Sequence, residues 1–255
     1  MSAGSAVYFF SDAHLGADSA DREAARERSL HDFLTSLIGR ASQLYIVGDL
    51  FDFWFEYQSV IPRKHFATVA KLQEVRARGI PITFVGGNHD RWGGTFFSHD
   101  LGIEFFGGEA ELDLGGRRTY IVHGDGLTEQ HWTGALMHRF TRHPLTVAVF
   151  RLLHPTIGFW IADLFSRHLA DNTKDKAVLD RAAAAQRRWA ADFLDQHPDV
   201  RLVIMAHTHR PMLDRLPDGR AFLNPGAFLD GGRYAEITAS GVELKQFTAE
   251  QLRPA

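Results

Sequence analysis

Short apolar runs alternate with amphipathic segments along the first third of the chain. Residues 7–10, 44–47 and 82–85 are short, largely apolar runs, a pattern typical of buried strands. Segments 22–40 and 66–78 repeat apolar residues at helical spacing, which predicts helices. Because strands separated by helices build βαβ units, this part of the chain predicts a parallel sheet covered by helices.

The second predicted helix has a defined inner face. Its apolar residues at helical spacing are Phe66, Val69, Ala70 and Leu72. We expect this face to pack on the sheet and the opposite face to contact solvent.

Later in the chain, paired short strands become the dominant pattern. Segments 111–114 and 118–122 flank Gly115-Gly116, which predicts a hairpin. Segment 176–196 predicts a helix and segment 202–205 a strand. Two further hairpins are predicted at 212–223 and 234–247.

Residues 128–175 differ from the rest of the chain in composition. They are rich in Phe, Trp, Leu, His and Arg, and Pro144 and Pro155 divide them. We interpret them as a helical lid insertion within one domain that spans residues 1–255, a length that suits a single large domain. The alternative is an ordinary helical pair packed on the main domain, with its arginines solvated.

Composition narrows the range of functions. The chain has 255 residues, of which 45% are hydrophobic and 23% charged, as in ordinary soluble globular proteins. A net charge of −3 and the lack of a basic stripe argue against a nucleic-acid partner. Because cysteine is absent, disulfides, cysteine–zinc sites and a cysteine nucleophile are excluded, which fits a reducing compartment. We expect neither a signal peptide nor a membrane-spanning segment.

Histidine, aspartate and asparagine side chains follow five of the predicted strands. In chain order they are Asp12, His14, Asp49, Asn88, His123, His207 and His209. Open α/β sheets bind ligands at the carboxyl ends of their strands, so we expect these side chains to converge. Imidazoles together with carboxylates suit first-row metals, and this many ligands is about right for two ions that share one carboxylate.

The same residues form five short motifs. They read Asp12-x-His14, Gly48-Asp49-x-x-Asp52, Gly87-Asn88-His89-Asp90, His123-Gly124-Asp125 and His207-x-His209. A single motif of this kind is more often an ordinary surface or core pair, but all five in this order resemble the calcineurin-like metallophosphoesterase family. The resemblance implies an α/β fold (α+β in part), a layered α/β/β/α sandwich, and a dinuclear-metal hydrolase.

The resemblance also implies how the ligands are shared. One ion would take Asp12, His14, Asp49 and His209. The other would take Asp49, Asn88, His123 and His207, so that Asp49 bridges the two.

Two further residues take catalytic roles by the same resemblance. His89 would not bind metal but would steady the phosphate or protonate the leaving group, and Asp52 is a candidate to orient it. The alternative for Asp52 is a helix-capping carboxylate. Asn88, His89 and His207 are also expected to contact the substrate.

Within the family, the chain is similar to the UDP-2,3-diacylglucosamine pyrophosphatases of lipid A synthesis. The similarity rests on segments 10–16, 48–54 and 207–211 and on the helical insertion. It implies attack of water at the α-phosphorus of UDP-2,3-diacylglucosamine, giving UMP and 2,3-diacylglucosamine 1-phosphate, with two divalent ions, expected to be Mn²⁺. Well-known proteobacterial members carry arginine at the position of His89.

The insertion favours a lipid substrate on physical grounds as well. Its large apolar side chains stand among cations such as Arg139, Arg142 and Arg151, which suits acyl chains beside a diphosphate. We therefore expect a nucleotide-linked glycolipid substrate and a cytoplasmic protein that is peripheral on the inner face of the cell membrane. By resemblance, the substrate would also contact Asn172, Lys174 and Lys176, for each of which a polar helix start is the alternative.

Two other functions stay open. The first is another dinuclear-metal phosphodiesterase or nucleotide pyrophosphatase on the same scaffold, although a soluble nucleotide leaves the aromatic insertion without a role. The second is a non-catalytic scaffold, which the full set of candidate ligands disfavours.

Overall fold

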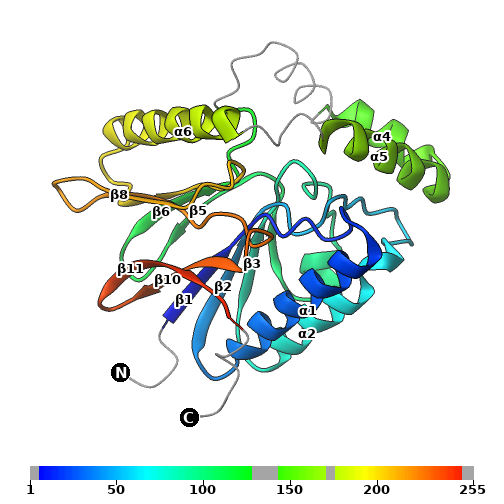
Figure 1. The fold of residues 1–255 in the computed structure, drawn as a ribbon, viewed down its shortest axis with the longest axis horizontal. Coiled ribbons are helices and arrows are strands. Elements are labelled where there is room, and N and C mark those ends of the chain that lie inside the picture. The colour runs from blue at the N-terminus through cyan, green and yellow to red at the C-terminus, as the bar shows by residue number, and fades with distance from the viewer. Residues whose placement is uncertain (1–5, 128–142, 171–175, 249–255) are drawn as a thin grey trace.

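Two stacked β-sheets form the centre of the computed structural model, which describes residues 6–127, 143–170 and 176–248 (Figure 1). The first sheet has the order β11-β10-β1-β2-β3-β4, with β1 to β4 parallel. Its strands are β1 (Ala6–Phe10), β2 (Ala41–Val47), β3 (Ile82–Val85), β4 (Glu104–Phe106), β10 (Arg233–Thr238) and β11 (Gly241–Gln246).

The second sheet has the order β5-β6-β7-β9-β8, and β6, β7 and β9 run parallel at its centre. Its strands are β5 (Glu109–Asp113), β6 (Arg118–Val122), β7 (Leu202–Ile204), β8 (Met212–Arg215) and β9 (Ala221–Asn224). The predicted hairpins are confirmed as β5–β6, β8–β9 and β10–β11.

Helices cover both outer faces, as the predicted α/β/β/α layering requires (Figure 1). The helices are α1 (Ala20–Ser36), α2 (Phe66–Ala77), α4 (Pro144–Leu152), α5 (Pro155–Ala170) and α6 (Lys176–Gln196). Helices α1 and α2 pack on the first sheet and α6 on the second. No helix in the described ranges combines the length and apolar character that crossing a membrane requires.

The continuous apolar runs of the first sheet are explained by burial on both faces. Phe9, Tyr45 and Val47 point between the two sheets, whereas Phe10 and Ile46 point toward the helices. Because successive side chains of a strand alternate between faces, a strand covered on both sides has to be apolar at every position.

The prediction of which residues form the inner face of α2 was wrong for two residues. Phe66 and Ala70 are exposed. A three-residue 3₁₀ turn precedes α2, and the face turned to the sheet starts at Thr68 and continues through Leu72 to Val75. Phe66, the first residue of the helix, lies outside that stripe.

Candidate metal centre

The loops that follow β1 and β2 run side by side and bring the first candidate ligands together. The amide of Asp12 donates to the carbonyl of Gly48 at 3.1 Å, and the amide of His14 donates to the carbonyl of Asp49 at 3.0 Å. These main-chain bonds fix Asp12 and His14 beside Asp49, as the strand-end argument predicted.

Five candidate ligands adopt a left-handed backbone. Their φ angles are 51° at Asp12, 44° at His14, 52° at Asp49, 68° at His207 and 57° at His209. No other non-glycine residue in the described part of the chain has a positive φ. Such conformations cost roughly 1–3 kcal/mol each and gather at functional sites, where surrounding contacts hold them. Local strain is therefore concentrated on the candidate ligands.

The Asp49 carboxylate lies at the centre of the cluster. Its Oδ2 is 3.0 Å from Nε2 of His123, 3.8 Å from Nε2 of His14 and 3.9 Å from Nε2 of His89. On the other side of His14, Oδ1 of Asp12 lies 3.4 Å from Nε2 of His209.

The ligand atoms separate into groups that match the two expected ion positions. One group is Asp12, His14 and His209; another is Asp49, His123 and His207; within each, the atoms lie within 4.8 Å of one another. Asp49 also groups with His14 and His89 at the same spacing. A carboxylate between two such groups is where a shared ligand would stand.

Three buried polar atoms of the cluster show that it suits cations. Oδ1 of Asp12, Oδ1 of Asn88 and Nε2 of His123 have no hydrogen-bond partner among the described residues. Leaving a buried polar atom unpaired is costly, so these atoms need another partner. Carboxylate, amide and imidazole lone pairs together are the donors that divalent first-row ions prefer.

A second layer of contacts orients these ligands. Nδ1 of His123 donates to the carbonyl of Val47 at 2.9 Å, which turns Nε2 toward the cluster; a cation bound there would take the place of the Nε2 proton. The Asp90 carboxylate accepts amide hydrogen bonds from Asp49, Leu50 and Gly87 at 3.2, 2.7 and 2.8 Å. Asp90 thus clamps the Asp49 loop to the Asn88 loop.

Charges within the cluster shift the pKa values of its members. Burial alone would lower the pKa of His123, but the Asp49 carboxylate raises it to about 10. Burial would raise the pKa of Asp49, but His123 and His89 lower it well below its usual range. Burial lowers the pKa of His14 to about 3, so this imidazole is neutral and able to donate its lone pair.

His89 lies against the cluster and contacts Asp52, the residue expected to orient it. Its Nδ1 is 2.5 Å from the main-chain carbonyl of Asp52, whereas the Asp52 carboxylate is 3.9 Å away. Burial lowers the pKa of His89, but the carboxylates of Asp49 and Asp52 outweigh it and raise the pKa. Asp52 therefore orients the ring mainly through its backbone and favours its cationic form through its charge.

A buried polar network that sequence reasoning missed holds the His207 turn. Nε2 of Gln186 donates to the carbonyl of Ala206 at 2.8 Å, and Nδ2 of Asn224 donates to Oε1 of Gln186 and to Oγ1 of Thr208. The sequence feature that could have indicated this network is Asn224, a polar residue at the end of the apolar strand β9 and directly before Pro-Gly.

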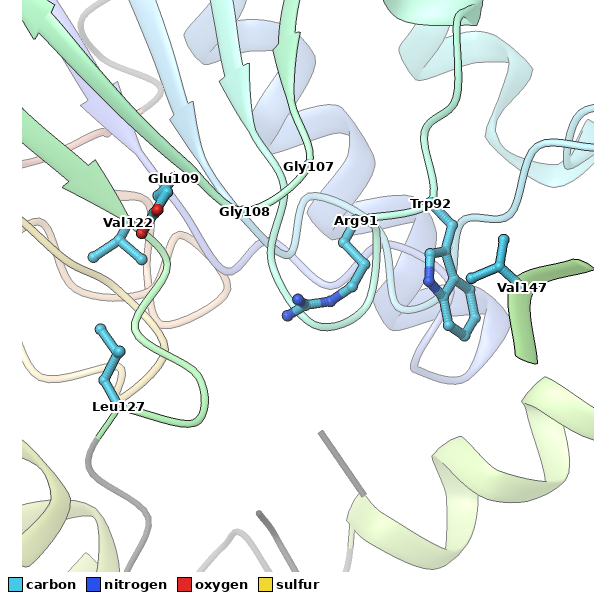
Figure 2. Close-up of a pocket in the computed structure, with 8 residues that line it drawn as sticks. All are labelled: Arg91, Trp92, Gly107, Gly108, Glu109, Val122, Leu127 and Val147. Atoms are coloured by element: carbon cyan, nitrogen blue, oxygen red, sulfur yellow. The ribbon is translucent and has the colours of Figure 1, made fainter. Parts of the chain in front are cut away.

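Arg91 was also missed. Its side chain is only 6% exposed and forms an ion pair with Asp125, whose side chain is 3% exposed. The pair joins the loop that carries Asn88 to the loop that carries His123. Arg91 also lines a cavity of about 540 Å³, together with Trp92, Gly107, Gly108, Glu109, Val122, Leu127 and Val147 (Figure 2).

The helical pair α4–α5 is attached next to the cluster. Phe150 of α4 packs on Phe55, with ring centroids 4.6 Å apart, and Phe159 of α5 packs on Tyr57 at 5.8 Å. Phe55 and Tyr57 follow closely after Asp52 in the chain, so the apolar helices contact the segment next to the cluster.

The three expected contacts from segment 172–176 have different outcomes. Asn172 and Lys174 lie outside the described residues. Lys176 opens α6 with an exposed side chain, and its carbonyl accepts a hydrogen bond from Arg210, which follows His209 in the chain.

Known proteins resemble this chain over most of its length. A family model described as calcineurin-like phosphoesterase matches residues 5–211. A UDP-2,3-diacylglucosamine hydrolase from Porphyromonas gingivalis is 29% identical over 247 residues, covering 91% of this chain and 93% of that protein. A protein of the same name from Enterobacter is 31% identical over 250 residues, covering 95% and 99%. A solved dimetal phosphatase from Danio rerio is 13% identical with a TM-score of 0.46, covering 92% of each chain.

Proposed function

Because this chain belongs to the calcineurin-like phosphoesterase family, we propose that it hydrolyses the diphosphate of UDP-2,3-diacylglucosamine. The products are UMP and 2,3-diacylglucosamine 1-phosphate. Membership of the family makes the protein a metallophosphoesterase, and the names of its relatives from Porphyromonas and Enterobacter support the substrate.

The observation that carries the proposal is the pair of ligand clusters on either side of Asp49. We assign Asp12, His14 and His209 with Asp49 to one ion, and Asn88, His123 and His207 with Asp49 to the other. The unpaired buried atoms of Asp12, Asn88 and His123 support this assignment. Divalent ions, in our proposal Mn²⁺, supply charge that polarises a phosphoryl group and lowers the pKa of water.

The chain's own residues then position and stabilise the reacting phosphate. His89, held by the Asp52 carbonyl and favoured as a cation, steadies the diphosphate on the side of the leaving group. Because a phosphate monoester leaves as an anion, a fixed positive charge at this position lowers the barrier. Asn88 and His207 contact the same phosphate beside their ion.

The acyl chains are assigned to the region of α4 and α5. Phe150 and Phe159 place apolar surface directly beside the residues that follow Asp52. A glycolipid substrate also places the enzyme at the surface of the cytoplasmic membrane, with residues 128–175 acting as a lid within one domain. Lys176, Asn172 and Lys174 are assigned to the sugar phosphate of the substrate.

Turnover of matched substrates tests the proposal. We expect UMP release from UDP-2,3-diacylglucosamine to be much faster than from the deacylated UDP-glucosamine, because only the first fills the apolar region. In water enriched in heavy oxygen, the label should enter UMP and not the lipid phosphate, since attack occurs at the α-phosphorus. Equal rates on both substrates would instead favour a soluble nucleotide pyrophosphatase.

A further inference from the structure

Both α4 and α5 carry a second apolar stripe that faces away from the protein. The stripes follow helical spacing along one side of each helix. They consist of Leu145, Val149 and Leu152 on α4 and of Ile157, Trp160 and Leu164 on α5, and the most exposed are Leu152 at 86% and Trp160 at 64%. The inner sides of the helices already pack through Phe150 and Phe159. A helix that is apolar on two sides is typically buried on both, so these stripes indicate a further partner.

A third apolar group lies on the main domain. Val60 is 44% exposed, and Phe66, against the prediction from helical spacing, is 67% exposed. The amide of Tyr57 donates to the carbonyl of Val60 at 3.1 Å, and the Tyr57 ring contacts Phe159. The turn 60–66 is thus tied to the segment on which α4 and α5 pack, at the same end of the molecule (Figure 1).

Cations outnumber acids in these segments, where Asp163, beside Leu164 on α5, is the one acidic residue. Arg63, Lys64 and Arg151 are exposed among the apolar side chains. Neither 57–73 nor 143–161 contains an aspartate or a glutamate, although the whole chain has a net charge of −3. Cations interspersed with exposed aromatic and aliphatic side chains are the composition of surfaces that bind anionic lipid head groups.

We propose that the turn 60–66 and the outer stripes of α4 and α5 form one docking face for an anionic bilayer. The main domain therefore contributes to membrane contact, and the face does not depend on the insertion alone. The proposal deepens the proposed function, since it places a lipid substrate where its chains leave the membrane, but membrane binding is measured without turnover. Local positive charge on a net acidic protein favours an acidic lipid surface over a second copy of this chain.

Vesicle co-sedimentation tests the docking face. The double variant Val60→Ser/Phe66→Ser should bind vesicles of phosphatidylethanolamine and phosphatidylglycerol about ten-fold more weakly than wild type, because two apolar side chains no longer enter the interface. Val178→Ser is the matched control, since Val178 is 41% exposed on α6, outside the face, and this variant should bind as wild type. All three proteins should hydrolyse detergent-dispersed substrate at the same rate.

A second pair of variants keeps the test independent of any one segment. Leu152→Ser/Trp160→Ser should weaken vesicle binding as well, and Arg63→Gln/Arg151→Gln should weaken it only when the vesicles are anionic. Unchanged binding in either apolar pair, or an equal loss in Val178→Ser, would overturn the proposal. So would a wild-type dimer in sedimentation analysis that Val60→Ser/Phe66→Ser converts to a monomer. If wild type releases no UMP but the vesicle results hold, the proposed substrate fails and the docking face stands.

Discussion

Replacing Gly87 by alanine displaces the Asp49 carboxylate without replacing any candidate ligand. Gly87 lies directly before Asn88, and a Cβ there would stand 2.2 Å from Oδ1 of Asp49 and 2.9 Å from its amide nitrogen. Ordinary van der Waals contact begins at 3.4 Å, so the carboxylate or the loop has to move by about 1 Å. The same Oδ1 accepts the amide hydrogen bond of His89 at 3.0 Å, and that bond is lost if the oxygen moves.

The displacement sets the expected size of the effect. Misplacing a reacting geometry by 1 Å costs on the order of 10²-fold in rate, and disturbing the support of a ligand costs about 10–100-fold in metal affinity. Gly87→Ala should therefore lose about 10²-fold in turnover and about 10–100-fold in metal affinity. Its free energy of unfolding should fall by about 1–3 kcal/mol.

Gly108→Ala is the matched control for this prediction. A Cβ at Gly108 meets nothing within 4 Å, and neither glycine has a positive φ. Gly108→Ala should keep the wild-type metal affinity in calorimetric titration, the wild-type turnover rate and the wild-type free energy of unfolding in urea. If Gly87→Ala bound metal with wild-type affinity, the position of the Asp49 carboxylate next to Gly87 would not be required for metal binding, and the argument would be refuted.

Three further predictions follow from single contacts. His89→Ala should keep its metal content and lose about 10²–10⁴-fold in turnover, because it removes the group that steadies the phosphate; wild-type turnover would contradict that role. Arg91→Met should lower the free energy of unfolding by about 3–5 kcal/mol, because it removes the arginine that pairs with the buried Asp125, and the double variant with Asp125→Asn should recover most of the loss in a urea-unfolding cycle. Burial lowers the pKa of His65 from 6.5 to about 3, so between pH 6.5 and about pH 3 the unfolded chain takes up a proton that the folded protein does not. The contribution of His65 to the free energy of unfolding therefore decreases as the pH decreases, by about 1.4 kcal/mol per pH unit. His65→Phe, which preserves an aromatic ring packed against Phe51, should have a shallower dependence of unfolding free energy on pH, and equal slopes would contradict this.

The parallel core and the convergence of the motifs could be predicted because they depend on local patterns. The runs before Asp12, Asp49 and Asn88 are apolar at nearly every position, which only strands buried on both faces require. Strand β4 could not be predicted in this way. It has three residues, Glu104–Phe106, and its pairing with β3 is set by tertiary contact and not by a periodic pattern.

The contacts that support the candidate ligands were harder to predict than the convergence of the candidate ligands. Gln186 looks like an ordinary member of a helix face, and Arg91 like a surface residue after a turn. Their roles depend on partners far along the chain, Ala206 and Asp125, which only the fold brings near. The inner face of α2 was misjudged because the 3₁₀ turn before Phe66 changes where the helix starts relative to the sheet.

Metal content of the wild type and of Asp49→Ala tests the central claim most directly. Both proteins are stripped with chelator, equilibrated with Mn²⁺, dialysed and analysed for bound metal per chain. If Asp49 is shared, the wild type should retain two ions and Asp49→Ala should retain neither tightly, because each position loses a ligand. A variant that still holds two ions tightly, or a wild type that saturates with one, would contradict the shared-carboxylate account.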